Sequence, residues 1–526
     1  MRFAIGITKL YVYFCTFMSK VRVRFAPSPT GPLHIGGVRT ALFNYLYAKQ
    51  QGGTMILRIE DTDQGRFVPG AEDYIVEALK WVGIGFDEGT HVGGPYAPYR
   101  QSDRKAMYRQ YADQLLASGN AYYAFDTTED LDAMREKLKA GGMAPQYDAV
   151  SRMSMKNSLT LSEDDVKQKL EAGEPYVIRI KLPRKEEVRF HDLIRGWVVV
   201  QTSAMDDKVL FKSDGMPTYH LANVVDDYTM KITHVIRGEE WLPSAPLHVM
   251  LYRYFGWEDV MPQFAHLPLI LKPDGNGKLS KRDGDRLGFP VFPLQWQDPA
   301  TGEISSGYRE RGYEPEGVMN MLALLGWHTS DNREIFSEKE LIELFTLEKI
   351  SKNGAKFDPE KAKWFNHQQL MLKPNAEIAA SIMPEAVSKG YNTTIEYLEK
   401  VVGLIKEKVT FKSEIIDKSA YFFAAPQQYD AQVSAKKWTA QAVQYLTAFA
   451  QALEQNKAAN AVEIEALFKS TGESTGIGAG SAMQPLRLAL SGEGGGPPIF
   501  EMLHLIGVEE SIARINTAIQ QIALTA

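Results

Sequence analysis

At 526 residues, with 44% hydrophobic and 24% charged side chains, the chain has the composition of a globular protein of several domains and not of a disordered or fibrous one. Its formal net charge of -6 gives no bulk attraction to nucleic acid, so an RNA or DNA partner would need a local basic surface. The single cysteine, Cys15, excludes an internal disulfide and a thiolate set for zinc. No apolar run is long enough to predict a membrane span.

The first twenty residues, MRFAIGITKLYVYFCTFMSK, are apolar but are interrupted by Lys9 and lack a clear small-residue cleavage site. We interpret residues 1–20 as an N-terminal extension, disordered or upstream of a natural start at Met18, because the regular pattern begins only at Val21. A targeting peptide is the alternative interpretation.

The first regular pattern predicts a βαβ unit. Residues 21–25 alternate like a strand, and the loop PSPTGPLHIGGVRT at 27–40 follows. Residues 40–50 carry apolar side chains at helical spacing, and 55–59 form a second strand that ends in the acidic run 60–63. A right-handed crossover places the loop and the carboxylates at the same edge of a parallel sheet, where open α/β sheets bind ligands.

Helical patterns follow at 69–82 and at about 103–118, and the pattern then changes. Residues 121–212 are charged and hold short strands such as VIRIKLP and GWVVVQ, which indicates an inserted α+β domain. Alternation resumes with a helix at 216–227, a strand at 234–237, a helix at 244–255 and a strand at 267–271. From about residue 315 the sequence is helical.

The predicted fold class is therefore α/β: a split Rossmann-type nucleotide-binding parallel sheet with an inserted α+β domain, followed by helical C-terminal domains. The predicted boundaries put the two halves of the sheet at 21–120 and 213–272, the insertion at 121–212, a loop and helical domain at 273–347, and a helical domain at 348–526.

Two segments have the chemistry to bind a polyphosphate. His34 and Gly36 lie at a predicted helix start, where unpaired N–H groups and an imidazole donor attract an anion; a capping or core role is the alternative for His34. The glycine-flanked run KLSKR at 278–282 offers mobile cations that can close on phosphates during a reaction; a solvated charged turn is its alternative.

His-Ile-Gly after the first strand and Lys-Leu-Ser-Lys after the last strand resemble the paired signature of class I aminoacyl-tRNA synthetases. The resemblance is closest to bacterial-type glutamyl-tRNA synthetases and extends from Val21 to the C-terminus. It rests on motifs in the family's order: PSPTGPLHIGG, ALFNYLYAK, LRIEDTD, GGPYAPYRQSDR, KSDGMPTYHLANVVDD, VIRGEEWLPSAPLHVMLYRYFGW and KLSKR.

The resemblance implies roles for residues on both sides of the predicted pocket. Catalysis is expected from His34, Lys278 and Lys281, and ATP binding from these three with Gly36, Gly37, Leu267 or a neighbour, and Ser280. Glutamate binding is expected from Arg24, Ser28, Glu60, Tyr219, Asn223 and Arg237, with Glu240 and Trp241 near the tRNA end or the adenosine. A planar guanidinium suits a side-chain carboxylate, a carboxylate suits the ammonium group, and residues four apart share a helix face. Ion pairs, helix caps and core packing are the alternatives.

The implied reaction joins glutamate to ATP as glutamyl-adenylate and then transfers the glutamyl group to the terminal adenosine of tRNA(Glu), with Mg²⁺ accompanying ATP. The inserted domain would bind the acceptor end, 273–347 the stem and 348–526 the anticodon. We expect a cytoplasmic monomer with no membrane partner and no metal bound by the protein. Zinc is not expected, because residues 121–125, AYYAF, hold no cysteine where some relatives carry a zinc site.

Other activities fit parts of this pattern. Glutaminyl-tRNA synthetase usually has glutamate and asparagine where Ser28 and Thr30 stand, and its anticodon half is a β-barrel. A short tRNA-modifying paralogue and a small-molecule nucleotidylyltransferase would not need the long chain after Lys281, and a non-catalytic RNA-binding protein would not need the intact motifs. Charging of tRNA(Gln), the anticodon-reading residues and the role of the loop at about 288–312 stay open.

Overall fold

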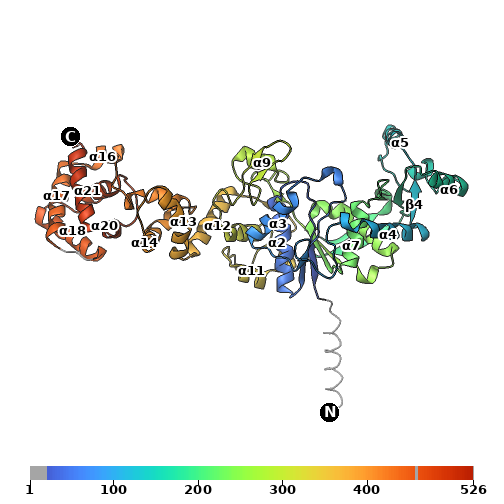
Figure 1. The fold of residues 1–526 in the computed structure, drawn as a ribbon, viewed down its shortest axis with the longest axis horizontal. Coiled ribbons are helices and arrows are strands. Elements are labelled where there is room, and N and C mark those ends of the chain that lie inside the picture. The colour runs from blue at the N-terminus through green and yellow to red at the C-terminus, as the bar shows by residue number, and fades with distance from the viewer. Residues whose placement is uncertain (1–19, 457–459, 525–526) are drawn as a thin grey trace, which may run out of the picture. The chain divides into compact units, whose positions relative to one another are not determined.

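The structure, a computed structural model, describes residues 20–456 and 460–524. The expected N-terminal extension, apart from Lys20, lies outside the described residues. Contacts divide the chain into two compact units, Met1–Arg311 with Val318–Ala362, and Gly312–Gly317 with Lys363–Ala526. The first unit holds the sheets and the second is a set of helices (Figure 1).

The predicted βαβ unit is confirmed. Strands β1 (Arg22–Phe25) and β2 (Thr54–Leu57) pair in parallel, and β3 (Glu88–Gly89) extends the sheet beyond β2. The crossover helix α2 (Ile35–Gln50) packs on both long strands. It begins five residues before the predicted helix because His34 caps it, with the His34 ring accepting a hydrogen bond from the Gly36 N–H.

The second half of the sheet has the order β7-β6-β10-β9. Its parallel strands are β9 (His234–Gly238) and β10 (Gln263–Leu267), and the hairpin of β6 (Glu187–Asp192) and β7 (Gly196–Gln201) joins them through β6. The two halves meet where the Thr233 N–H donates to the Arg22 carbonyl oxygen at 2.9 Å. The predicted split parallel sheet is confirmed, and GWVVVQ belongs to it and not to a separate sheet.

The strand expected at 267–271 is misplaced in the prediction. Strand β10 ends at Leu267, and Pro268, which has no N–H to donate, separates it from β11 (Ile270–Leu271). Strand β11 pairs with β14 (Ala355–Lys356), a short strand that the helical pattern did not predict.

Four more helices belong to this part of the first unit, and the last of them packs on β6. These are α3 (Ala71–Val82), α4 (Lys105–Ala117), α7 (Tyr219–Thr229) and α8 (Ala245–Tyr254). Helix α7, which contacts α4 and α8, starts three residues later than predicted because Pro217 and the extended Thr218 precede it. Its start sets which side chains reach the sheet edge.

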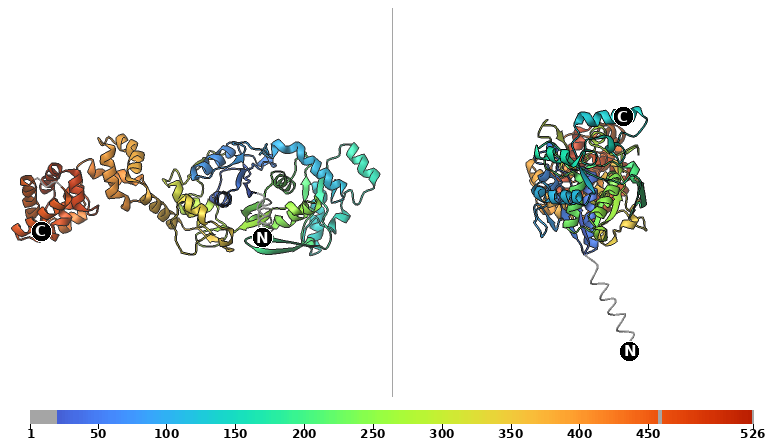
Figure 2. Two further views of the ribbon diagram at one scale, coloured as in Figure 1. Left: turned by 90° about the horizontal axis from the view of Figure 1, so that it is seen from below. Right: turned by 90° about the vertical axis from the view of Figure 1, so that its right-hand side faces the viewer.

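The inserted segment also forms a small sheet of its own. Its antiparallel strands are β4 (Ala121–Ala124), β5 (Val177–Ile180) and β8 (Val209–Phe211), and its helices are α5 (Thr128–Ala140) and α6 (Glu163–Glu171). Within the first unit, α5 and α6 lie at the end away from α11 (Glu338–Leu344) (Figures 1 and 2). Tyr122, Met134, Tyr147 and Met155 form the core of this subdomain.

The loop at 288–312 follows α9 (Lys281–Leu287) and forms the hairpin of β12 (Trp296–Gln297) and β13 (Ile304–Ser305). It packs on α2 and α3, since the Ile35 N–H of α2 donates to the Val291 carbonyl oxygen at 2.9 Å and Tyr74 of α3 meets Trp296 edge to face. The loop therefore links α9 to the start of α2.

The second unit is helical throughout its described residues, as predicted. Two helices, α10 (Pro315–Ala323) and α12 (Pro359–Leu372), run across the division between the units. The others are α13 (Asn375–Ser388), α14 (Ile395–Ile405), α15 (Glu414–Lys418), α16 (Ala431–Lys437), α17 (Ala440–Gln455), α18 (Ala461–Thr475), α19 (Gly480–Ser491), α20 (Ile499–Ile506) and α21 (Val508–Gln521). Trp438, Tyr445 and Phe449 are fully buried in their core.

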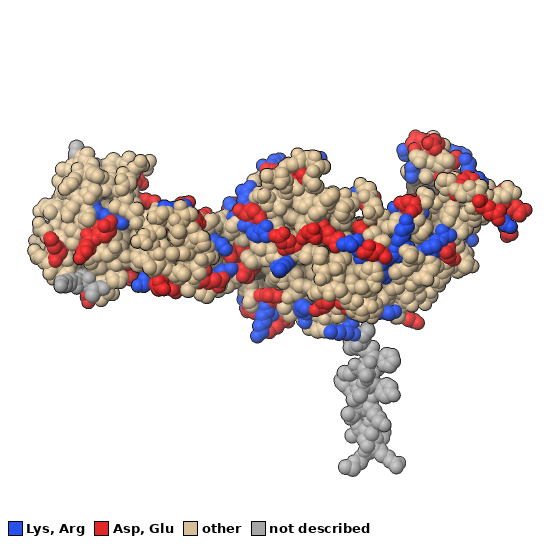
Figure 3. Space-filling view, viewed as in Figure 1, with Lys and Arg blue, Asp and Glu red and all other residues tan. Residues whose placement is uncertain are grey.

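Charged side chains of both signs are mixed over the visible face of the first unit (Figure 3). That face shows no broad area of one sign, so charge alone does not mark a nucleic-acid surface there. Within the described residues, no helix combines the length and the apolar character that crossing a membrane requires.

Candidate active site

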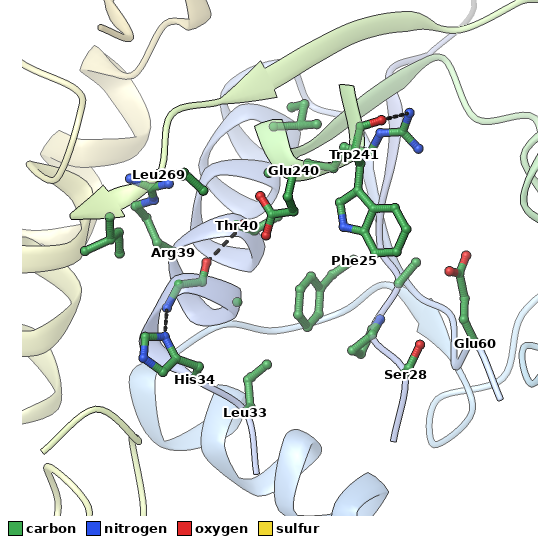
Figure 4. A pocket seen from close by; sticks show the side chains of 18 of the residues that line it. Phe25, Ser28, Leu33, His34, Arg39, Thr40, Glu60, Glu240, Trp241 and Leu269 are labelled. Atoms are coloured by element: carbon green, nitrogen blue, oxygen red, sulfur yellow. Dashed lines mark hydrogen bonds between the residues drawn. The ribbon is translucent and has the colours of Figure 1, made fainter. Parts of the chain in front are cut away.

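A pocket of about 670 Å³ opens at the carboxyl ends of β1, β2, β9 and β10, the edge at which open α/β sheets bind ligands. The predicted site residues that line it are Arg24, Ser28, His34, Gly36, Gly37, Glu60, Tyr219, Asn223, Arg237, Glu240, Trp241, Lys278 and Ser280. His34 lies at one side, and Ser28, Glu60 and Trp241 lie at the other, with Phe25 between them (Figure 4). The pocket therefore has two chemically different ends.

Two predicted residues do not line this pocket. Leu267 is fully buried at the end of β10, and the next three residues, Pro268, Leu269 and Ile270, form the wall instead. Lys281 pairs its ammonium group with a Glu303 carboxylate oxygen at 3.3 Å, on the loop that follows α9.

His34 presents a neutral imidazole with one unused donor. Its Nδ1 accepts the Gly36 N–H at 3.1 Å, so the proton of the neutral ring is on Nε2. Nε2 is shielded from solvent and has no hydrogen-bond partner among the described residues. Burial, aided by the charge of Lys278, lowers the pKa of His34 from 6.5 to about 4. The ring can therefore donate to an anion without itself being charged.

The N–H groups at the start of α2 are already partnered, and the expectation that they are unpaired is wrong. Ile35 donates to the Val291 carbonyl, Gly36 to the His34 ring and Gly37 to the His34 carbonyl. Capping satisfies the groups that the helix itself leaves open. An anion at this end would meet the imidazole N–H rather than backbone N–H groups.

Lys278 supplies a cation at the same end of the pocket. Its Nζ donates to Glu240 Oε1 at 2.8 Å, and both side chains are partly exposed. Burial opposes the charged form of Glu240, but the hydrogen bond and charge of Lys278, the backbone N–H of Glu240 and the charge of Arg39 together outweigh it and lower the pKa of that carboxyl. Ser280 is the N-cap residue of α9, and its backbone N–H and its hydroxyl both donate to Asp283 Oδ2, at 3.1 and 2.5 Å.

The other end of the pocket holds a buried arginine whose partner is also buried. Arg24 is 3% exposed, and its Nε and Nη2 donate to the two oxygens of Asp227 at 3.1 and 3.3 Å. Asp227 also accepts from Arg58 Nη1 at 2.7 Å. Burial raises the cost of the Asp227 charge, but Arg24 and Arg58 more than offset it and lower the pKa of that carboxyl. Arg24 is thus fixed in place while its remaining N–H groups stay available.

Both protein donors to the Glu60 carboxylate bind the same oxygen. Its Oε1 accepts from Arg58 Nη2 at 2.8 Å and from Asn223 Nδ2 at 3.0 Å. Arg58 precedes Glu60 by two residues, so both side chains point to one side of an extended backbone. A carboxylate held through one oxygen can accept a positively charged donor with the other.

Arg237 donates hydrogen bonds to both Tyr219 and Trp241. Its Nη1 donates to the Tyr219 hydroxyl at 2.7 Å and its Nη2 to the Trp241 carbonyl at 3.4 Å. The Tyr219 and Trp241 rings lie 4.6 Å apart, centroid to centroid. Burial lowers the pKa of Arg237, which nevertheless remains a cation because a free guanidinium titrates far above neutral pH.

Two buried partners of the site residues, Arg58 and Asp227, were not predicted from the sequence. The alternation of LRIEDTD could have indicated Arg58, because it shares a strand face with Glu60. Nothing local could have indicated that Asp227, 203 residues from Arg24, pairs with it. Among the described residues, no group of three or more His, Cys, Asp and Glu is placed to hold a metal ion; the expectation that zinc is absent stays a prediction.

Two family models match the chain, one over the part that holds the pocket and one over the helical part. Residues 20–364 match the family described as tRNA synthetases class I (E and Q), catalytic domain, and residues 371–519 match the family described as anticodon binding domain.

Two relatives and one solved structure that are similar to the chain are described as glutamate–tRNA ligases. A glutamate–tRNA ligase of Cytophaga hutchinsonii is 57% identical over 95% of this chain and 97% of its own length, and one of Parabacteroides distasonis is 58% identical over 95% and 99%. The crystal structure of a glutamate tRNA ligase from Elizabethkingia meningosepticum, in complex with its amino acid, has a TM-score of 0.92 and 50% identity, covering 96% of this chain and all of that one.

Proposed function

The chain belongs to the glutamate–tRNA ligases of the class I tRNA synthetase family, and we propose that its pocket holds ATP at the His34 end and glutamate at the Glu60 end. The observation that carries this division is the separation of charges. His34 lies at one side and Glu60 at the other (Figure 4). The charge of Lys278 acts on His34, whereas the charges of Arg24 and Glu60 act on Arg237.

The amino-acid end has groups suited to the side-chain carboxylate and to the ammonium group of glutamate. Arg24 and Arg237 keep N–H groups beyond those given to Asp227, Tyr219 and Trp241, which suits them to a side-chain carboxylate. Glu60 Oε2 would accept from the substrate ammonium group. Ser28, Tyr219 and Asn223 complete this end of the pocket. Glutamine has no side-chain carboxylate to pair with the two guanidinium groups, so it would be bound more weakly.

In the first step, the α-carboxylate of glutamate attacks the α-phosphorus of ATP and the bond to pyrophosphate breaks. His34 Nε2–H, Lys278 and Lys281 would stabilise the charge on the phosphates, with Mg²⁺ bound as the counter-ion of ATP. Gly36, Gly37 and the wall at Leu267–Ile270 would contact adenosine, and Ser280 would lie beside the phosphates. No protein nucleophile is required, so positioning supplies much of the rate.

In the second step, a ribose hydroxyl of the terminal adenosine of tRNA(Glu) attacks the activated carbonyl, and AMP leaves. Glu240 and Trp241 would border this adenosine. We assign acceptor-end binding to 121–212, stem contact to 273–347 and anticodon binding to 348–526. We further propose a cytoplasmic monomer that binds no zinc.

Aminoacylation of tRNA(Glu) by single variants tests the division of the pocket. Arg24→Gln should raise the KM for glutamate by roughly tenfold or more, the usual effect of losing a hydrogen bond to a charged group, with the KM for ATP unchanged. Lys278→Ala should instead lower kcat and weaken ATP binding.

Matched controls lie close in the chain. Arg22, on the same strand as Arg24, pairs with Glu88, and Lys272 pairs with Asp283; neither residue lines the pocket. Arg22→Gln and Lys272→Ala should leave both KM values near those of the unchanged protein. Equal effects of Arg24→Gln on glutamate and on ATP would overturn the proposed division.

A further inference from the structure

A chain of buried polar groups extends from the pocket into the sheet. Arg237 Nε donates to His266 Nε2 at 3.0 Å, and His266 Nδ1 meets Asp192 Oδ2 at 2.6 Å. The three residues lie on the neighbouring strands β9, β10 and β6 and are 5%, 0% and 0% exposed. Neither His266 nor Asp192 lines the pocket, so neither can touch a ligand there.

These hydrogen bonds are compatible with only one protonation state of the three side chains. A guanidinium only donates, so His266 Nε2 must be the acceptor and the ring proton must be on Nδ1. That proton is donated to Asp192, whose other oxygen accepts the N–H groups of Ile194 and Arg195 at 3.0 and 2.8 Å. His266 is therefore a neutral ring held in one tautomer and one orientation.

The fixed ring in turn restricts Arg237. Three of the five N–H bonds of its guanidinium are directed to His266, Tyr219 and the Trp241 carbonyl, which leaves two for a ligand. Without the acceptor on His266, the guanidinium could rotate about its long side chain, and its free edge would lose its orientation.

We propose that Asp192 and His266 are a positioning pair that orients Arg237 toward the side-chain carboxylate of glutamate. The inference rests on the role proposed above for Arg237. It assigns to both residues an effect on glutamate binding and none on ATP binding.

Two substitutions of His266 separate positioning from simple packing. His266→Gln can place an amide oxygen near the position of Nε2 and keep an acceptor for Arg237. His266→Asn can place an amide N–H near Nδ1 and keep the donor to Asp192, but it leaves Arg237 without its acceptor. His266→Asn should raise the KM for glutamate by roughly 10- to 100-fold, as expected for a lost hydrogen bond to a charge, whereas His266→Gln should keep this KM much closer to that of the unchanged protein.

Asp192→Asn tests the tautomer without removing the ring. An asparagine amide N–H facing Nδ1 would favour the proton on Nε2, which would then oppose the Nε–H of Arg237. A wrong tautomer can disable a site whose geometry is otherwise intact. This variant should raise the KM for glutamate while the KM for ATP and kcat at saturating glutamate change by no more than about twofold.

The experiment measures aminoacylation of tRNA(Glu) by the full-length protein, with glutamate and ATP varied in turn. His234→Asn is the control, since His234 lies on β9 away from the pocket, in contact with Tyr47. If Arg237→Lys leaves the KM for glutamate unchanged, the role of Arg237 is wrong and the positioning role fails with it. If Arg237→Lys raises this KM but His266→Asn and Asp192→Asn do not, or if both KM values rise together, the positioning pair alone is refuted. Should His266→Asn fail to fold, Asp192→Asn decides.

Discussion

Replacing Asp227 by asparagine removes the negative charge that two buried guanidinium groups share. Asp227 is 2% exposed and accepts hydrogen bonds from Arg24 at 3.1 and 3.3 Å and from Arg58 at 2.7 Å. The variant keeps the size of the side chain, but it directs an amide N–H at a guanidinium that can only donate. We therefore expect a loss of stability and a displaced Arg24.

The size of the effect follows from burial. Removing one partner of a buried ion pair costs about 3–5 kcal/mol of unfolding free energy, because the remaining charge is left uncompensated. Asp227→Asn leaves the charge of Arg24 uncompensated, whereas Arg58 keeps its ion pair with Glu60 at 2.8 Å, and the variant retains an acceptor oxygen. We therefore expect a loss near the lower bound, about 3 kcal/mol. The displaced Arg24 should also raise the KM for glutamate by roughly tenfold or more.

The neighbouring residue provides a matched control. Asp226 is also fully buried and accepts from Gln101, Arg104 and Tyr108, but it does not contact Arg24. Urea unfolding should show a similar loss for Asp226→Asn, whereas aminoacylation should show a raised KM for glutamate only in Asp227→Asn. Equal KM values in the two variants would refute the argument that Asp227 orients Arg24.

Three further predictions concern the ATP end. Glu303→Gln removes the carboxylate that pairs with Lys281 at 3.3 Å and so leaves Lys281 free for the phosphates of ATP. Because this pair is exposed, the KM for ATP should fall by no more than about fivefold. A rise in this KM would contradict the proposed role of Lys281. Burial and Lys278 lower the pKa of His34 from 6.5 to about 4. Between these two pH values the unfolded chain binds more protons than the folded protein, so the contribution of His34 to stability is lost as the pH falls through this range. Between about pH 7 and about pH 4.5, the urea midpoint should therefore fall further for the unchanged protein than for His34→Gln. Excess EDTA should stop aminoacylation by removing the magnesium of ATP but leave the Tm unchanged, because the described residues hold no metal cluster; a lower Tm would indicate a structural metal.

Local patterns were enough to predict the architecture of the site. The alternation of strand and helix around PSPTGPLHIGG placed the loop and Glu60 at one sheet edge, and the spacing of Tyr219 and Asn223 placed both on one helix face; all of these residues line the pocket. Strand and helix periodicity depends on neighbours in the sequence, so it can be read without the tertiary structure.

Contacts between distant segments could not be predicted in the same way. The partner of Arg24 is 203 residues away, and the N–H of Ile35 is satisfied by a carbonyl of the loop at 288–312. Lys281 belongs to a recognisable motif, yet its direction is set by an ion pair with Glu303 on that same loop. These contacts depend on how the segments pack and not on the residues beside them.

The most direct test of the central claim is aminoacylation by the purified protein with radiolabelled glutamate and, separately, glutamine, on purified tRNA(Glu) and tRNA(Gln). We expect glutamate to be esterified to tRNA(Glu) and glutamine to be refused, and transfer of glutamate to tRNA(Gln) would show how strictly the tRNA is selected. Transfer of glutamine, or ATP binding without transfer of glutamate, would contradict a pocket built around two guanidinium groups for a side-chain carboxylate.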